Sequence, residues 1–193
     1  MNLPNRLTVT RIILTILIII LCLFPFYSIG VSFPKFNIKG LVVDSTYFIA
    51  GIIYIIASFT DYLDGSIARK NNQVTDKGKL LDAIADKVLV NSVLVIFASR
   101  GFIPAIIPVI YIFRDEVVNA LKMDILRRGY VTAAIKSGKI KTAAMMTGLG
   151  MLFFYNLPFE LWNIKVADFL IYFATVMSIV SGIEYYNIWK KVK

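Results

Sequence analysis

The sequence predicts an all-α integral membrane protein with six transmembrane helices and both termini on the cytoplasmic side. Of its 193 residues, 58% are hydrophobic and only 17% are charged, whereas a soluble domain carries about a quarter charged residues. The apolar residues gather in repeated runs of about 20, which is long enough to cross the hydrocarbon core of a bilayer as a helix. We expect residues 1–193 to form a single domain.

Six apolar runs define the expected spans. The first is too long for the apolar core of a signal peptide and no cleavage-site pattern follows it, so we expect it to be retained. The fifth run is short, and we expect its helix to begin earlier, as an amphipathic stretch around Ala134. The single cysteine, Cys22, excludes an intrachain disulfide. The expected spans are 7–28, 45–68, 80–99, 103–126, 142–157 and 166–189.

The orientation follows from the distribution of basic residues. Most of the 21 lysines and arginines lie near the N-terminus, the 69–79 and 127–141 loops and the C-terminus. Because basic residues are retained on the cytoplasmic side, we expect both termini there, and an even number of spans agrees with this. Much of the net charge of +9 would then face the anionic inner leaflet. The opposite side holds only Lys35, Lys39, Arg100 and Lys165.

Four aspartates lie where charge is costly. Asp61 and Asp64 are three residues apart near the end of the second run, and Asp82 and Asp86 are four residues apart near the start of the third. Both spacings place a pair on one helix face. Since a loop of about ten residues joins the two spans, the spans should be antiparallel neighbours and the four carboxylates should converge at one depth.

The composition narrows what such a cluster can do. The chain contains no histidine, so a metal site would depend on carboxylates and water, which suit Mg²⁺ or Mn²⁺. Four anions at low dielectric require cations or protonation, and intramembrane ionisable groups usually mark function. We therefore expect one or two divalent ions. In the alternative, the aspartates cap helices or pair with Lys77, Lys79 and Lys87.

Small and basic residues surround the acidic pairs. Gly65, Ala68 and Gly78 would let a flat group approach the helix backbone, and Arg69 could hold a phosphate through two hydrogen bonds. Each residue alone is a weak signal, because small residues are common on packed transmembrane faces. Together they are typical of a site for a metal-bound diphosphate carrying a planar group.

A second group of charges lies later in the chain. Arg114 falls well inside the fourth apolar run, and Lys136, Lys139 and Lys141 precede the fifth. A basic pocket at membrane depth suits a phosphorylated alcohol. Alternatively, the lysines only follow the positive-inside rule.

The acidic segment resembles a known family. Its pattern, D-x₂-D-G-x₂-A-R-x₈-G-x₃-D-x₃-D, is the signature of the CDP-alcohol phosphotransferases, and the six-span layout is similar too. The chain matches it without departure in residue type or spacing, and the resemblance covers essentially the whole chain. The matching residues are Asp61, Asp64, Gly65, Ala68, Arg69, Gly78, Asp82 and Asp86.

The resemblance implies roles for individual residues. The enzyme would move a phosphatidyl or similar group from a CDP-linked donor to an alcohol and release CMP. The four aspartates would hold the divalent metal, and Asp86 would also take the proton of the acceptor hydroxyl. The expected contacts of the CDP-diacylglycerol donor come from the acidic segment and from the matched N-terminal segment. They are Asn5, Thr8, Asp61, Gly65, Ala68, Arg69, Thr75 and Asp76.

Three further stretches resemble the branch of this family that uses glycerol 3-phosphate: "NLPNRLTVTRI", "FRDEVVNALK" and "SGKIKT". Lys122 stands where that branch would have arginine. The resemblance implies phospholipid biosynthesis in the cytoplasmic membrane, with the active site facing the cytoplasm, a homodimer, and no nucleic-acid partner.

Other readings stay open at this point. With the same chemistry the acceptor could be serine, inositol phosphate or phosphatidylglycerol. An intramembrane prenyltransferase also uses acidic pairs and Mg²⁺ on a diphosphate, but would not require the set of Gly65, Ala68 and Arg69. A cation transporter would place polar residues at mid-bilayer, whereas this acidic cluster lies near the ends of its spans.

Overall fold

The computed structural model describes residues 3–70, 76–133 and 135–192. The side chains of residues 3–6, 61–70, 76, 77, 79 and 80 lie outside this description. The chain is mostly helical and divides into two compact units, residues 1–96 with 150–164, and residues 97–149 with 165–193.

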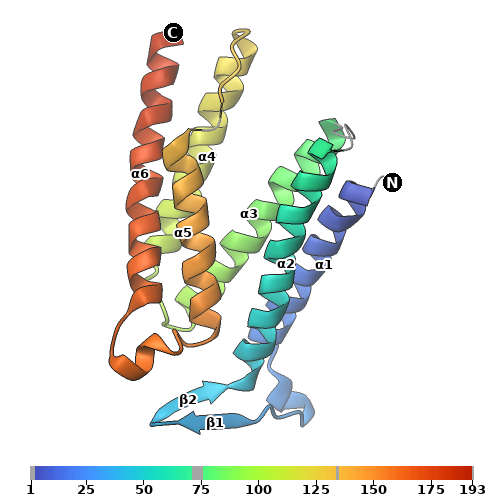
Figure 1. Ribbon diagram of the computed structural model, residues 1–193, viewed down its shortest axis with the longest axis vertical. Helices are drawn as coiled ribbons and strands as arrows, with labels where there is room; N and C mark the ends of the chain where they lie inside the picture. The colour runs from blue at the N-terminus through green and yellow to red at the C-terminus, as the bar shows by residue number, and fades with distance from the viewer. Residues whose placement is uncertain (1–2, 71–75, 134, 193) are drawn as a thin grey trace. The chain divides into compact units, whose positions relative to one another are not determined.

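The first unit contains helices α1 (Leu3–Leu23), α2 (Ser45–Lys70) and most of α3 (Asp76–Ser99) (Figure 1). Helices α1 and α2 pack side by side. At Gly51 on α2, an added Cβ would lie 2.8 Å from the Cβ of Phe153. The absence of a side chain at this position therefore lets the C-terminal end of α5 approach α2 closely.

A short β-hairpin connects α1 to α2. After a 3₁₀ turn (Phe26–Ile29), strand β1 (Lys35–Ile38) pairs antiparallel with β2 (Leu41–Asp44). Lys39 and Gly40 form the two-residue turn with φ values of 49° and 90°, as in the primed turns that match the twist of a hairpin. The Asp44 amide donates to the Tyr155 hydroxyl at 3.0 Å, which ties β2 to the segment after α5. These two strands were not predicted from the sequence.

The second unit contains α4 (Ile106–Arg127), most of α5 (Lys136–Phe153) and α6 (Val166–Val192). Helix α4 packs against α6. Helices α5 and α6 meet at Gly148, where an added Cβ would lie 2.8 Å from Cγ1 of Ile171. A second 3₁₀ turn (Phe159–Trp162) precedes α6 and belongs to the first unit.

Each of the six predicted apolar segments contains a helix, but three bounds were wrong: α1 ends at Leu23 rather than at 28, α4 begins at Ile106 rather than at 103, and α5 ends at Phe153 rather than at 157. The fifth helix begins at Lys136, before the predicted apolar run and close to the expected amphipathic start near Ala134. Of the described helices, only α6 is long and apolar enough to cross a membrane by length and composition; the apolar parts of α1 and α2, Leu7–Leu23 and Ser45–Thr60, are shorter. Six membrane crossings therefore stay a prediction.

Candidate active site

The acidic residues lie on α2 and α3. Asp61 and Asp64 fall in the last part of α2, whose backbone is helical to Lys70, and their side chains lie outside the described residues. Asp82 and Asp86 lie one turn apart on α3, and both side chains are partly exposed. The predicted spacing of this second pair on a helix is confirmed, whereas the meeting of the two pairs stays a prediction.

A buried arginine contacts one of these carboxylates. Arg11 on α1 has no exposed surface, and its Nη1 donates to Oδ1 of Asp82 at 3.0 Å. The carboxylate itself is 46% exposed, so one oxygen faces a fixed cation while the side chain still reaches solvent. Arg11 was predicted only to be one of the basic residues on the cytoplasmic side, and this contact was not predicted. Arg11 lies one helical turn after Thr8, and both side chains are buried.

Most of the residues predicted to contact CDP-diacylglycerol have side chains that the structure does not describe. This is true of the side chains of Asn5, Gly65, Ala68, Arg69 and Asp76 and of the whole of Thr75. Among the described residues no group of three or more histidine, cysteine, aspartate or glutamate side chains could hold a metal. The side chains of Asp61 and Asp64, two of the four predicted ligands, are not among the described residues. Asp82 and Asp86 are hard oxygen donors one turn apart, which fits a divalent ion of the Mg²⁺ class.

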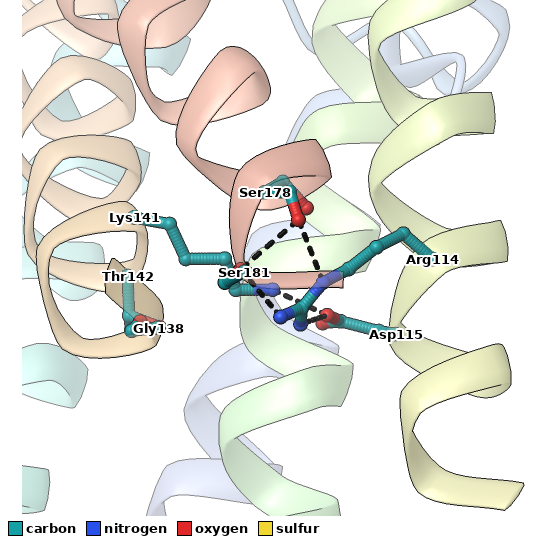
Figure 2. Close-up of polar contacts among 7 residues, drawn as sticks. All are labelled: Arg114, Asp115, Gly138, Lys141, Thr142, Ser178 and Ser181. Carbon is teal, nitrogen blue, oxygen red and sulfur yellow. Dashed lines mark hydrogen bonds and ion pairs between the residues drawn. The ribbon is translucent and has the colours of Figure 1, made fainter. Parts of the chain in front are cut away.

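The second charged group forms a buried cluster in the other unit. Arg114 on α4 donates through Nε to the Ser178 carbonyl at 2.8 Å and through Nη2 to the Ser181 hydroxyl, both on α6 (Figure 2). Its Nη1 donates to Oδ1 of Asp115 at 2.7 Å. Only 11% of the Arg114 side chain is exposed. All three nitrogens of the guanidinium donate a hydrogen bond, and the group is largely shielded from solvent.

Lys141 on α5 joins the same cluster. Its amino group donates to Oδ1 of Asp115, the oxygen that also accepts from Arg114. It lies 4.1 Å from the ring centroid of Tyr111, at the distance of a cation–π contact. The Lys141 side chain is 6% exposed. Two buried cations from α4 and α5 therefore share one carboxylate oxygen.

The structure brings together two of the four residues predicted for the acceptor. Arg114 and Lys141 meet at Asp115, whereas Lys136 and Lys139 have exposed side chains on α5. Lys122, the departure from the resembling branch, lies 4.5 Å from the ring centroid of Tyr185. Sequence reasoning missed Asp115, Ser178 and Ser181. An acidic residue directly after Arg114 in an apolar run was the available signal.

Comparisons with known proteins agree over the full chain. The model of the CDP-alcohol phosphatidyltransferase family matches residues 1–180. The chain is 37% identical over 193 residues to the CDP-diacylglycerol–glycerol-3-phosphate 3-phosphatidyltransferase of Bacillus subtilis, covering 100% of this chain and 97% of the relative. The protein of that name from Haemophilus influenzae is 35% identical to this chain, and the match covers 98% of this chain and 94% of the relative.

A further relative with the same name, from Mycoplasma pneumoniae, is 32% identical to this chain, and the match covers 100% of this chain and 89% of the relative. The family model and these relatives cover both structural units, including the acidic segment and the Arg114 cluster. This chain therefore belongs to the CDP-alcohol phosphatidyltransferase family, a family of membrane proteins.

Proposed function

We propose that the protein transfers the phosphatidyl group of CDP-diacylglycerol to the primary hydroxyl of glycerol 3-phosphate, giving phosphatidylglycerol phosphate and CMP. The observation that carries this proposal is the full-length similarity to relatives that share one name for this activity. The chemistry of the two charged clusters supports it, because one suits a diphosphate and the other suits a second phosphate.

The donor side of the reaction rests on the acidic segment. Asp61, Asp64, Asp82 and Asp86 are the residues that would hold one or two divalent ions, Mg²⁺ or Mn²⁺, and the family uses a divalent metal. Such an ion, when bound, neutralises charge on the diphosphate and on the departing CMP. The proposed contacts of the CDP-diacylglycerol donor are Asn5, Thr8, Asp61, Gly65, Ala68, Arg69, Thr75 and Asp76.

Asp86 is the proposed base. Its carboxylate takes the proton of the acceptor hydroxyl, whose oxygen attacks the β-phosphorus of the donor; the bond from that phosphorus to the CMP oxygen breaks, and CMP leaves. Because the leaving group is already good, positioning and charge neutralisation contribute more than covalent help. Partial exposure of Asp86 on α3 is compatible with this role, since an aqueous acceptor has to reach it.

The acceptor phosphate is proposed to bind Arg114 and Lys141. Both cations are nearly buried and lie within contact of a single carboxylate oxygen. The guanidinium offers a planar fork and the ammonium offers a point charge, which together suit a phosphate dianion. Lys136 and Lys139, which are exposed on the same helix as Lys141, would attract the acceptor toward this pair.

The setting of the enzyme is proposed as a homodimer in the cytoplasmic membrane, with six spans, cytoplasmic termini and the active site open to the cytoplasm. The amphiphilic donor supports this placement, since its acyl chains stay in the bilayer while its head reaches the aqueous acceptor. The distribution of basic residues described above favours this orientation.

An acceptor panel tests the proposal. Purified protein with Mg²⁺ or Mn²⁺ and CDP-diacylglycerol should release CMP when glycerol 3-phosphate is added, and not with serine, inositol phosphate or phosphatidylglycerol. Release with another acceptor alone would reassign the substrate. A prenyltransferase would not be stabilised thermally by CDP-diacylglycerol, and a cation transporter would move metal into liposomes without producing CMP.

A further inference from the structure

Asp115 has no role in the proposed reaction, yet it lies at the centre of the Arg114 cluster. Its Oδ1 accepts hydrogen bonds from Nη1 of Arg114 and from Nζ of Lys141, and its side chain is 14% exposed. A carboxylate so close to the proposed phosphate-binding cations carries the wrong charge to bind phosphate. Its contribution has to come through the cations.

We infer that Asp115 is a positioning residue for acceptor recognition, which holds Arg114 and Lys141 side by side as one phosphate-binding unit. This inference rests on the proposed function. Two cations brought together at low dielectric repel each other strongly, and a lysine that is nearly buried is costly without a charged partner. One shared carboxylate oxygen offsets both costs and fixes the distance between the two cations.

The serines of α6 complete the arrangement. The Ser178 carbonyl accepts from Nε of Arg114, and the Ser181 hydroxyl accepts from Nη2 while donating to the Ser178 carbonyl at 3.0 Å. Gly182 leaves room for the arginine stem, because an added Cβ would lie 3.3 Å from Cγ of Arg114. Helix α6 therefore sets the plane of the guanidinium while Asp115 sets its distance from Lys141 (Figure 2).

The guanidinium of Arg114 has the geometry to contact a ligand as well. A guanidinium has five N–H groups, one on Nε and two on each terminal nitrogen. The contacts to Ser178, Asp115 and Ser181 use one N–H on each nitrogen of Arg114, and each terminal nitrogen carries a second. The net charge of Arg114, Lys141 and Asp115 is one positive unit, so the cluster attracts a phosphate while staying stable without one.

The substitution Asp115→Asn tests the inference. The amide keeps the size of the side chain but removes the charge that holds the two cations. We expect the KM for glycerol 3-phosphate to rise about tenfold or more, the loss expected for a hydrogen bond between charged groups. The KM for CDP-diacylglycerol should change less than about twofold, and Asp115→Glu, which restores the charge, should recover part of the loss.

A matched control lies on the same helix. Asp124 on α4 accepts from Nε of Arg128 at 3.0 Å and from Nε1 of Trp189 on α6 at 2.7 Å. Asp124→Asn therefore breaks an α4–α6 contact of similar kind outside the cluster, and should leave the KM for glycerol 3-phosphate unchanged. If Asp124→Asn and Asp115→Asn raise this KM equally, the effect reflects packing of α4 and the inference is wrong.

Two further readouts keep the result decisive. Glycerol 3-phosphate should raise the thermal midpoint of the wild-type protein and raise that of Asp115→Asn less. If Asp115→Asn does not fold, Ser181→Ala, which removes one arginine partner, should raise the acceptor KM severalfold. An unchanged or lower acceptor KM in the folded variants overturns the inference. Absence of CMP release by the wild-type protein with glycerol 3-phosphate would instead overturn the proposed function.

Discussion

At the scale of single residues, two charged clusters built on a buried or nearly buried arginine occur among the described residues, one in each unit. Arg11 contacts Asp82 in the first unit, and Arg114 and Lys141 contact Asp115 in the second. In both clusters an arginine that is hardly exposed fixes a carboxylate. The residue-scale predictions therefore separate carboxylates that carry out chemistry from carboxylates that hold a cation in place.

Asp86→Asn should abolish turnover while the protein stays folded. The amide keeps the shape of the carboxylate but cannot take the acceptor proton, and loss of a general base costs about 10²–10⁴-fold in rate. The measurement is CMP release at saturating CDP-diacylglycerol and glycerol 3-phosphate, with thermal unfolding in detergent as the control for folding. Turnover at the wild-type rate would remove Asp86 as the base.

Asp82→Asn should destabilise the protein more than Arg11→Met does, even in EDTA. The first change takes a counter-charge from a guanidinium with no exposed surface, whereas the second removes the buried charge and leaves a carboxylate that water can solvate. We expect a loss of roughly 1–3 kcal/mol for Asp82→Asn. Thermal midpoints of the two variants, each compared with wild type, test the order; the reverse order would show that Arg11 does not depend on Asp82.

The residue patterns predicted the second acidic pair, because a spacing of four residues places both side chains on one face of a helix. They also predicted a basic pocket of four residues, of which the structure brings only Arg114 and Lys141 together, at Asp115. They could not predict that Arg11 reaches Asp82, 71 positions away, since this contact depends on how α1 packs. The convergence of Asp61 and Asp64 with Asp82 and Asp86 stays a prediction, because the first two side chains lie outside the described residues.

At the scale of elements, close helix packing depends on individual glycines. Gly148 lies where α5 meets α6. An added Cβ there would lie 3.2 Å from the Ala167 carbonyl as well as 2.8 Å from Ile171. At Gly150, two residues further along α5, the nearest atom is Cε1 of Tyr54 at 3.6 Å, an ordinary contact.

Gly148→Ala should therefore destabilise the protein, whereas Gly150→Ala should not. Overpacking at a tight contact costs about 1–3 kcal/mol, and alanine stabilises a helix relative to glycine by about 1 kcal/mol. At position 148 this helix stabilisation offsets only part of the overpacking cost. At position 150, where the added methyl group makes an ordinary contact, it is a net gain in stability. Thermal unfolding of both variants in the same detergent measures the difference. Equal midpoints would mean that α5 and α6 separate enough to admit a methyl group.

The helices were predictable and the hairpin was not. Runs of apolar residues define the helices, and their bounds moved by a few residues because polar residues such as Lys136 continue the helix beyond the apolar run. The strands are four residues long with a Lys-Gly turn, so they carry neither a long alternation nor an Asn-Gly signal. The contact between Asp44 and Tyr155, far apart in sequence, holds this hairpin in place.

At the scale of the whole molecule, membrane topology is the prediction that most needs a test. In a Cys22→Ser background, a cysteine at Lys191 should react with a membrane-impermeant reagent only after the membrane is opened. A cysteine at Asn37, in the hairpin, should react in intact cells. The opposite pattern would invert the orientation, and labelling of both sites in intact cells would contradict an even number of spans.

The hairpin also offers a site at which an epitope can be inserted. Its turn at Lys39 and Gly40 is exposed, and a side chain at Gly40 would meet nothing within 4 Å. Loop tips of this kind tolerate inserted sequence, and the Tyr155 hydroxyl anchors the end of β2. An epitope inserted in this turn would let an antibody fragment bind at a fixed orientation to a chain of only 21.8 kDa. The added mass would make particles of this small enzyme large enough to align by electron microscopy.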